Sequence, residues 1–470
     1  MGSNKRLYAD IMAVQQEVTA SCNIIVVKLP NGKTIRIIVD CGLFHEKQYE
    51  GLNGVLPFKA EKVDFCLVTH NHVDHVGRLP FMVKKGYSKK IYATESTCKL
   101  LPLALYDCFK VLKDVSKRKN EKCLYNEINV RKTLELLKPC KYNQTIELGE
   151  HVKATFFENG HLMGAALILI QITYPGCDDI NILFTGDYNN KNMFFDVNPL
   201  PKWVLELPLT VVQEATYGDM ESKEITKCFK DNVKKYIEQG KSVLALVFSL
   251  ERAQEILYEL KTMQKAGQLE DIPIYLDGKL ARRYTELYLK DGLDVKDEMR
   301  DFLPENLTYV DKENREEVLE NTDKKIILTT SGMGSYGPAQ VYIPEYLKRS
   351  DAVIHFTGYT AVGTLGNIIQ NTEEGKNVQV GGLVVKKHAK VESTAEYSAH
   401  AKSDEMIGFL NQFKNLKLVL VNHGETEVKE KFADKIVDEV DAKNVGLLGS
   451  DYLFRINSNG FEKTLTTKFY

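Results

Sequence analysis

Four metal-ligand side chains stand close together in one short stretch, as His70, His72, Asp74 and His75. Imidazole and carboxylate groups are ligands for zinc-like ions. Because alternate residues of an extended segment point the same way, His70 and His72 can share one ion. Asp74 and His75 then face a second ion. With ten histidines in 470 residues, this spacing arises by chance with a probability on the order of 10⁻⁴. The pattern favours a metal site over unrelated surface histidines.

These ligands lie between two segments of different character. The apolar run 63–69 is typical of a buried strand, and residues 76–82 can begin a helix. We therefore expect the ligands on a loop that connects a strand to a helix.

Further candidate ligands follow later in the chain. His161 lies between glycines and can complete a three-histidine site with His70 and His72, although a histidine beside glycine is more often a turn residue. Asp187 ends a buried strand, where one carboxylate can bridge two cations or form an ordinary turn. The first cluster favours the metal-site interpretation of both. His423 stands at the tip of another apolar strand.

A hairpin is predicted before the histidine-rich loop. Residues 23–29 and 34–39 are apolar runs that flank Asn31-Gly32, a strong turn signal. The second run ends at Asp40, whose carboxylate can accept a hydrogen bond from a metal-bound imidazole or can form a turn. The local sequence leaves both interpretations open.

The rest of the chain contains two segments with different patterns of secondary structure. The segment 97–137 is mostly helical and rich in lysine, which could contact a phosphate backbone but more often marks a solvated helix face. Between 210 and 356 strands and helices alternate, which predicts a parallel sheet with helices on both faces. At 470 residues, the whole chain is long enough to form two or three compact units.

Composition narrows the classes of function. The formal net charge is −2, so a nucleic acid would be held by a local site and metal ions rather than by bulk positive charge. No stretch approaches the ~18 apolar residues of a membrane span. Nine cysteines without a Cys-x-x-Cys pair fit free thiols in a reducing compartment. We expect a cytoplasmic protein.

Together the motifs resemble the metallo-β-lactamase superfamily and its β-CASP ribonucleases, similar to RNase J and the 3′-end-processing endonucleases, with the layout of the compact prokaryotic members. The motifs that carry the resemblance are Asp40, His70, His72, Asp74, His75, His161, Asp187, Glu214 in Gln-Glu-Ala-Thr-Tyr-Gly, His400 in Ser-Ala-His, and His423 in Asn-His-Gly-Glu. The resemblance implies an α/β fold, an αββα sandwich with an inserted three-layer α/β β-CASP domain. The expected boundaries are 1–208 and 395–470 for the sandwich and 209–394 for the insertion.

The same resemblance implies roles for these residues. One metal would be bound by His70, His72 and His161, the other by Asp74, His75 and His423, with Asp187 bridging and Asp40 supporting a ligand. The expected cofactors are two Zn²⁺ ions, with Mn²⁺ as the alternative, and the expected reaction is RNA hydrolysis by a hydroxide that both ions activate. His400, oriented by Glu214, would be the general acid. Single-stranded RNA would lie in the cleft between the domains, and Arg252, Ser331, Gly332 and Ser398 are candidate substrate contacts.

Three positions depart from the resemblance, Glu251, Ala215 and Lys402, where relatives usually carry Gly, Ser and Asp. A carboxylate at 251 would repel phosphate if it faced the substrate. Two other functions stay open, a hydrolase of small esters, thioesters or lactones, and an RNA-binding homologue without catalysis. The choice between an endonuclease and a 5′-exonuclease and the existence of a homo-oligomer also stay open.

Overall fold

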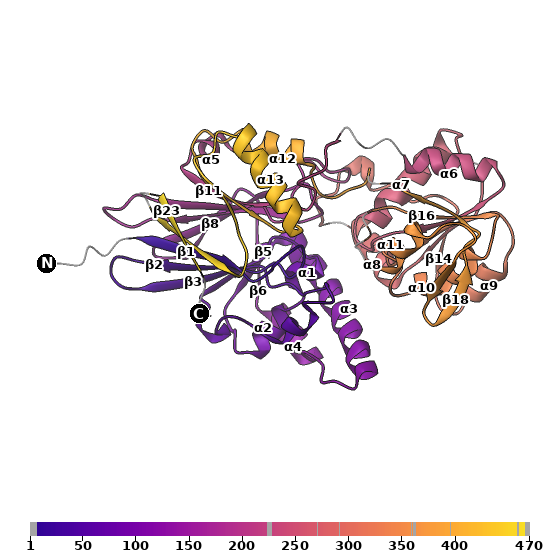
Figure 1. Cartoon of the computed structure of the whole chain (residues 1–470), viewed down its shortest axis with the longest axis horizontal. Coiled ribbons are helices and arrows are strands. Elements are labelled where there is room, and N and C mark those ends of the chain that lie inside the picture. Colours follow the sequence, from indigo (N-terminus) through magenta and orange to yellow (C-terminus); the bar gives the residue numbers. More distant parts are fainter. Residues whose placement is uncertain are drawn as a thin grey trace. The chain divides into compact units, whose positions relative to one another are not determined.

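The computed structural model describes residues 7–222, 228–269, 271–290, 292–358, 360, 363–394, 396–457 and 460–465. The chain forms two compact units, which are coloured along the sequence in Figure 1. One unit combines Met1–Ser222 with Ala399–Tyr470, and the other is Lys223–Ser398. Each is described by itself.

Two sheets form the centre of the first unit. The first sheet has the strand order β23-β22-β1-β2-β3-β4-β5-β6. Its strands are β1 (Tyr8–Ala13), β2 (Asn23–Lys28), β3 (Thr34–Val39), β4 (Phe65–Leu67), β5 (Ile91–Thr94), β6 (Leu137–Cys140), β22 (Tyr452–Asn457) and β23 (Gly460–Leu465). The second sheet has the order β21-β20-β11-β10-β9-β8-β7. Its strands are β7 (Thr145–Gly149), β8 (Val152–Glu158), β9 (Ala166–Ile172), β10 (Ile180–Phe184), β11 (Leu209–Glu214), β20 (Leu416–Asn422) and β21 (Val445–Leu447).

The two sheets pack face to face. Ile25 and Ile37 of the first sheet share one fully buried apolar cluster with Ile168 and Ile182 of the second. Helices cover the outer faces (Figure 1). On the first sheet they are α1 (Val73–Val76), α2 (Leu79–Lys84), α3 (Glu95–Lys119) and α4 (Glu127–Glu135), and on the second α5 (Lys202–Leu205), α12 (Ser403–Leu410) and α13 (Thr426–Glu439). The unit is therefore the αββα sandwich that the resemblance implies.

The predicted hairpin is the connection between β2 and β3. These strands are antiparallel, with Asn23 opposite Val39. The Leu29 N–H donates to the Lys33 carbonyl at 2.9 Å and closes the turn. The register places Asp40 directly after β3, at the sheet edge where the histidine-rich loop begins.

The second unit is built on a parallel sheet with the order β14-β13-β15-β12-β16-β19. Its strands are β12 (Ser242–Leu246), β13 (Ile274–Asp277), β14 (Leu307–Val310), β15 (Ile326–Thr329), β16 (Ala352–Phe356) and β19 (Lys390–Ser393), and β17 (Asn377–Val380) and β18 (Leu383–Lys386) form a separate hairpin. Its helices are α6 (Phe229–Glu238), α7 (Arg252–Lys265), α8 (Lys279–Tyr288), α9 (Arg315–Glu320), α10 (Ala339–Leu347) and α11 (Leu365–Asn371).

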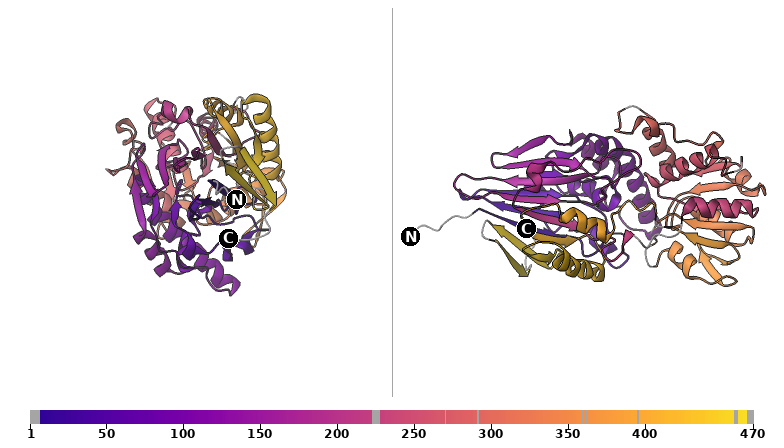
Figure 2. Two further views of the ribbon diagram at one scale, coloured as in Figure 1. Left: turned by 90° about the vertical axis from the view of Figure 1, so that its left-hand side faces the viewer. Right: turned by 90° about the horizontal axis from the view of Figure 1, so that it is seen from above.

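Strand β16 shows how this sheet lies between two helical layers (Figure 2). Ile354 and Phe356 pack in one buried cluster with Tyr342 of α10. His355 points to the opposite face, because side chains alternate along a strand. There its ring contacts Phe229 of α6, with centroids 5.0 Å apart. The second unit is therefore a three-layer α/β domain.

Both boundaries of the insertion differ from the sequence expectation, since the second unit is Lys223–Ser398 rather than 209–394. The sequence places residues 209–214 in the inserted domain, but they form β11, which pairs in parallel with β10 and β20 of the sandwich. The apolar strand Leu209–Glu214 has the same local pattern in either unit, and its partners are distant in sequence.

Among the described residues no helix is long and apolar enough to cross a membrane.

Candidate metal centre

The histidine-rich loop leaves β4 and enters α1, with His72 directly before the helix. Two contacts fix it against the segment that follows β3. The Cys41 N–H donates to the His75 carbonyl at 2.7 Å. Gly42 lies so close that an added Cβ would be 1.4 Å from the carbonyl oxygen of Asp74. Glycine at this position is what allows the loop to approach.

Three imidazoles converge at one place, those of His70, His72 and His161. Nδ1 of His72 lies 3.1 Å from Nε2 of His70 and 3.1 Å from Nε2 of His161. The Nδ1–H of His161 donates to the Ala399 carbonyl at 2.9 Å, so Nε2 turns its lone pair toward the other two rings. The loop between β8 and β9 supplies His161, 89 residues from His72.

A second group forms beside the first and contains Asp74, His75 and His423. Nε2 of His75 lies 3.1 Å from Nε2 of His423. An oxygen of Asp74 is 3.9 Å from the first of these nitrogens and 3.8 Å from the second. His423 follows β20 directly, so its position depends on the second sheet.

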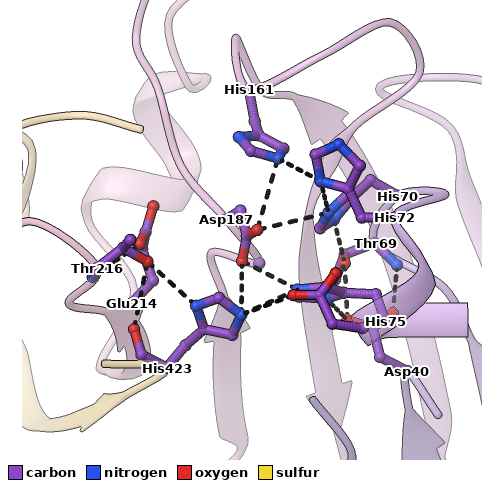
Figure 3. A network of polar contacts seen from close by, with 12 residues as sticks. Asp40, Thr69, His70, His72, His75, His161, Asp187, Glu214, Thr216 and His423 are labelled. Atoms are coloured by element: carbon purple, nitrogen blue, oxygen red, sulfur yellow. Dashed lines mark hydrogen bonds and ion pairs between the residues drawn. The ribbon is translucent and has the colours of Figure 1, made fainter. Parts of the chain in front are cut away.

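Asp187 belongs to both groups, as Figure 3 shows. Its Oδ2 lies 3.5 Å from Nε2 of His70 and 3.5 Å from Nε2 of His161. Its Oδ1 lies 3.1 Å from Nε2 of His75 and 3.3 Å from Nε2 of His423. The carboxylate thus directs one oxygen to each group, the geometry of a bridging ligand.

The donor set fits two divalent cations. Two nitrogens bound at 2.0–2.1 Å to one tetrahedral ion lie ~3.3 Å apart, close to the nitrogen separations in both groups. Neutral imidazole lone pairs repel one another unless a cation lies between them. Within the described part of the chain, buried Oδ1 of Asp187 has no hydrogen-bond partner. A cation would satisfy this oxygen and the converging nitrogens together.

Outer groups fix the tautomers of these histidines. The His75 Nδ1–H donates to Oδ2 of Asp40 at 2.8 Å, which leaves Nε2 for a metal. Asp40 also accepts from the N–H and the hydroxyl of Thr69, at 2.8 and 2.7 Å. On the other side, His423 Nδ1 contacts the Thr216 hydroxyl at 3.2 Å. Neither threonine could be singled out in the sequence, since a lone Thr beside a motif is common.

Asn159 is a further supporting residue that sequence reasoning missed. Its side-chain amide donates to the carbonyls of Thr185 and Asp187, at 2.8 and 2.7 Å. Its Oδ1 accepts from the His161 N–H at 3.0 Å. One buried side chain therefore ties together the loops that carry two of the ligands. In the sequence, Asn before Gly indicates only a turn.

His400 and Glu214 meet beside the metal ligands. The His400 Nδ1–H donates to Glu214 at 2.9 Å, and His400 Nε2 lies 3.8 Å from Oδ2 of Asp187. Glu214 is held in turn by the N–H groups of Tyr188 and Thr216, at 2.6 and 3.0 Å. The imidazole thus has a fixed carboxylate on one nitrogen and the ligand groups near the other.

The pKa of His400 is shifted in the opposite direction from the pKa values of three candidate ligand histidines. Burial lowers the pKa of His70 and His161 and that of His72 to about 4, so all three are neutral, as ligands must be. Burial also opposes the charge of His400, but the carboxylates of Glu214 and Asp187 outweigh it and raise its pKa. In the absence of cations His400 therefore holds its proton more tightly than an ordinary histidine.

The candidate substrate contacts belong to the second unit. Ser331 and Gly332 lie just after β15, and Ser398 is the last residue of the unit. Arg252 begins α7, where its guanidinium donates to Glu255 at 3.0 Å and to the carbonyl of Thr357. Their contact with substrate stays a prediction.

Glu251 and Lys402, two of the positions that depart from the resemblance, have buried side chains. Glu251 is 4% exposed and accepts a hydrogen bond from the Tyr288 hydroxyl at 2.7 Å. Its carboxylate is therefore buried against Tyr288. Lys402 is 3% exposed, with its ammonium 3.5 Å from the centroid of the Tyr217 ring. Ala215 is buried against Gly218 and Gly424.

Comparison with known proteins agrees with this geometry. Three family models match consecutive parts of the chain, a metallo-beta-lactamase superfamily domain over 29–196, a Beta-Casp domain over 253–369, and a Zn-dependent metallo-hydrolase RNA specificity domain over 384–445. A ribonuclease of Thermus thermophilus is 30% identical over 424 residues, covering 88% of this chain and 92% of that protein.

Two archaeal proteins are also similar. An RNase J-like protein of Methanocaldococcus jannaschii is 28% identical, over 85% of this chain and 89% of that protein. Transcription termination factor FttA of Methanosarcina mazei is 29% identical, over 85% of this chain but only 65% of that longer protein. With its sandwich, its inserted α/β unit and its paired metal-ligand groups, the chain belongs to the Beta-Casp ribonucleases of the metallo-beta-lactamase superfamily.

Proposed function

We propose that this protein is a metal-dependent ribonuclease that hydrolyses phosphodiester bonds of RNA. The observation that carries the proposal is the carboxylate of Asp187, which directs one oxygen to each of two ligand groups. The match to an RNA specificity domain over 384–445 and the similarity to a ribonuclease support RNA as the substrate.

The ligand sets divide between two ions in this proposal. His70, His72 and His161 would hold one ion, and Asp74, His75 and His423 would hold the other, with Asp187 available to both. The nitrogen-rich sets favour Zn²⁺, and Mn²⁺ is the alternative that carboxylate ligands allow. When bound, such ions lower the pKa of a water molecule and neutralise charge on phosphoryl oxygens.

His400 supplies the proton that the leaving group needs. Hydrolysis joins a water oxygen to phosphorus and breaks the bond from phosphorus to the 3′ oxygen. Glu214 holds Nδ1 of His400, so the proton available for transfer is on Nε2, the nitrogen near Asp187. This nitrogen protonates the departing 3′ oxygen, and Glu214 stabilises the charged imidazole beforehand.

The hydrogen-bonded pair of His400 and Glu214 favours this reaction over hydrolysis of small esters or lactones. An alkoxide that leaves phosphorus is strongly basic and gains from a positioned acid. A histidine whose pKa is raised by neighbouring carboxylates is suited to that task. An RNA-binding protein without catalysis would need neither this pair nor complete ligand groups.

Cleavage of one RNA tests the proposal. The substrate is supplied with a 5′-monophosphate or a 5′-hydroxyl and a 3′ label, and the protein is stripped of metal and reloaded with Zn²⁺ or Mn²⁺. We expect cleavage only with metal. Internal fragments from both substrates indicate an endonuclease, and a mononucleotide ladder from the phosphorylated RNA alone indicates a 5′-exonuclease. RNA that is bound but never cleaved would contradict the proposal, and so would no binding.

A reducing, cytoplasmic location is part of the proposal. All nine cysteines are free thiols in the structure. Five of them, Cys22, Cys41, Cys66, Cys108 and Cys140, are buried. Free thiols are typical of proteins kept in a reducing compartment.

A further inference from the structure

A buried cation lies behind the candidate acid, outside both metal-ligand groups. Lys402 stands directly before α12 and is 3% exposed. Its ammonium lies 3.5 Å from the centroid of the Tyr217 ring. An ammonium removed from water is strongly attracted to the electron-rich face of an aromatic ring. This contact therefore restricts both side chains.

Tyr217 in turn contacts the ring of His400. The centroids are 5.8 Å apart and the ring planes are at 88°. Perpendicular rings at this separation attract each other edge to face. The imidazole of His400 therefore has Glu214 on Nδ1 at 2.9 Å and Tyr217 beside the ring. The hydrogen bond to Glu214 fixes Nδ1, and the contact with Tyr217 restricts rotation of the imidazole about that atom.

Backbone hydrogen bonds hold the two segments in place. The turn that carries Tyr217 is closed by the Gly218 N–H, which donates to the Ala215 carbonyl at 3.1 Å. The Ser403 N–H donates to the Met220 carbonyl at 2.9 Å, which joins the same turn to the start of α12. Backbone hydrogen bonds therefore connect the segments that carry Lys402 and Tyr217.

We propose that Lys402 and Tyr217 form a positioning pair that keeps the imidazole of His400 aimed at the leaving oxygen. The inference rests on the proposed ribonuclease function and adds two residues to it. Because Lys402 is buried, it acts through Tyr217 and not by contact with RNA. A small rotation of a catalytic group slows the chemical step and leaves substrate binding intact.

Four substitutions test whether the charge of Lys402 and the aromatic ring of Tyr217 matter, rather than only the space that the two side chains fill. Lys402→Met removes the charge, whereas Lys402→Arg keeps a cation for the ring. Tyr217→Leu removes the ring, whereas Tyr217→Phe keeps it. We expect Lys402→Met and Tyr217→Leu each to lower kcat roughly tenfold with KM unchanged, because a buried cation–π contact and its geometry are lost. The two conservative variants, Lys402→Arg and Tyr217→Phe, should retain most of the activity.

Lys414→Met is the matched control. Lys414 is an exposed lysine, and its ammonium pairs with Glu206 at 2.9 Å on the surface. We expect this variant to keep the wild-type kcat and KM. Thermal unfolding of every variant shows whether a loss of activity follows from a loss of folded protein.

A substrate with a sulfur leaving group makes the test specific for proton donation. In this RNA the 3′ oxygen of the scissile bond is replaced by sulfur, so the phosphorus–sulfur bond breaks and a thiolate leaves without needing a proton. We expect Lys402→Met, Tyr217→Leu and His400→Ala to approach the wild-type rate on this substrate. An equal loss on both substrates, or no loss on the oxygen substrate, would overturn the positioning role. If the wild-type protein cleaved neither RNA, the ribonuclease function itself would be wrong.

Discussion

The imidazoles that converge on the metal centre are held at their outer nitrogens. Nδ1 of His75 binds Asp40, that of His161 binds the Ala399 carbonyl, and that of His423 contacts Thr216. A histidine fixed in this way offers a lone pair on the other nitrogen without first reorienting. The affinity for metal therefore depends on residues that do not touch the ion.

Asp40→Asn tests this dependence. Asp40 has φ +63°, which asparagine tolerates, so the backbone is expected to persist. The substitution leaves one acceptor oxygen where two accept from Thr69 and His75. We expect metal affinity to fall by about 10- to 100-fold in a competition with a chelator. Asp219→Asn, the same substitution at an exposed aspartate, is the control, and equal affinities in the two variants would contradict a supporting role of Asp40.

Glu214→Gln tests the charge of His400. In the metal-free protein Glu214 and Asp187 raise the pKa of His400 against the effect of burial. A raised pKa means that the ionised pair stabilises the fold below pH ~6.5 and that this stabilisation is lost as pH rises through the folded-state pKa. We expect the variant to lower this pKa and to lose that pH dependence, measured by NMR titration and urea unfolding. An unchanged His400 pKa would contradict the assignment.

Residue types and spacing were enough to single out the first cluster of candidate metal ligands, whereas the full set of ligands comes from the resemblance. His70, His72, Asp74 and His75 stand together in the sequence, and this density is what makes them recognisable. The supporting residues Asn159 and Thr216 could not be predicted, because a single polar residue next to a glycine or a motif has many structural roles. Their partners become visible only when distant segments are brought together.

At the scale of elements, the segments that carry most of the candidate ligands follow strand ends, although Asp74 and His75 already lie in α1. The histidine-rich loop follows β4, Asp187 follows β10 and His423 follows β20, while the supporting Asp40 follows β3. The β3 and β4 ends belong to the first sheet and the β10 and β20 ends to the second. The packing of the two sheets therefore sets the distances between the ligand groups.

Gly186→Ala tests how tightly the end of β10 is constrained. Gly186 has φ +57°, and an added Cβ would lie 2.8 Å from Cβ of Thr69. Asp187 follows directly, so relief of this contact displaces the shared carboxylate. We expect a loss of bound metal and a decrease of about 1–3 kcal/mol in the free energy of unfolding.

Gly176→Ala is the matched control for that substitution. Gly176 also has a positive φ of +77°, but an added Cβ would meet nothing within 4 Å. It therefore reports backbone strain alone, about 1 kcal/mol, with metal content unchanged. Equal metal content in the two alanine variants, measured by mass spectrometry, would show that contact with Thr69 does not position Asp187.

Local patterns predicted many elements but not all of their partners. The hairpin of β2 and β3 follows from Asn31-Gly32 between apolar runs, and the alternation after residue 242 follows from strand and helix periods. The pairing of β1 with β22 joins segments more than 400 residues apart. No local signal specifies such a pair, and the same reason explains why β11 belongs to the sandwich although the sequence places it in the insertion.

At the scale of the whole molecule, the candidate metal ligands all belong to one of the two units. His70, His161 and Asp187 precede the inserted unit, and His423 follows it. The centre therefore joins two segments of the sandwich that are separated by the insertion in sequence. Bound metal should stabilise the sandwich and leave the inserted unit unchanged.

Hydrogen exchange with and without chelator tests this division. A ligand present at 100 times its dissociation constant stabilises the state that binds it by ~2.7 kcal/mol. We expect metal removal to increase exchange at the ends of β4, β10 and β20, and to leave β12 and β15 of the second unit unchanged. Equal increases in both units would show that the metal supports the whole chain rather than the sandwich.

The most direct test compares metal content and RNA cleavage in the wild-type protein and in the Asp187→Ala and His400→Ala variants. Wild-type protein should hold two ions per chain and cleave RNA. His400→Ala should keep both ions and lose most of the cleavage, because an acid is removed but no ligand. Asp187→Ala should lose both bound metal and cleavage. If metal content fell equally in the two variants, or if Asp187→Ala still bound two ions and cleaved RNA, the site could not consist of a shared carboxylate and a separate acid.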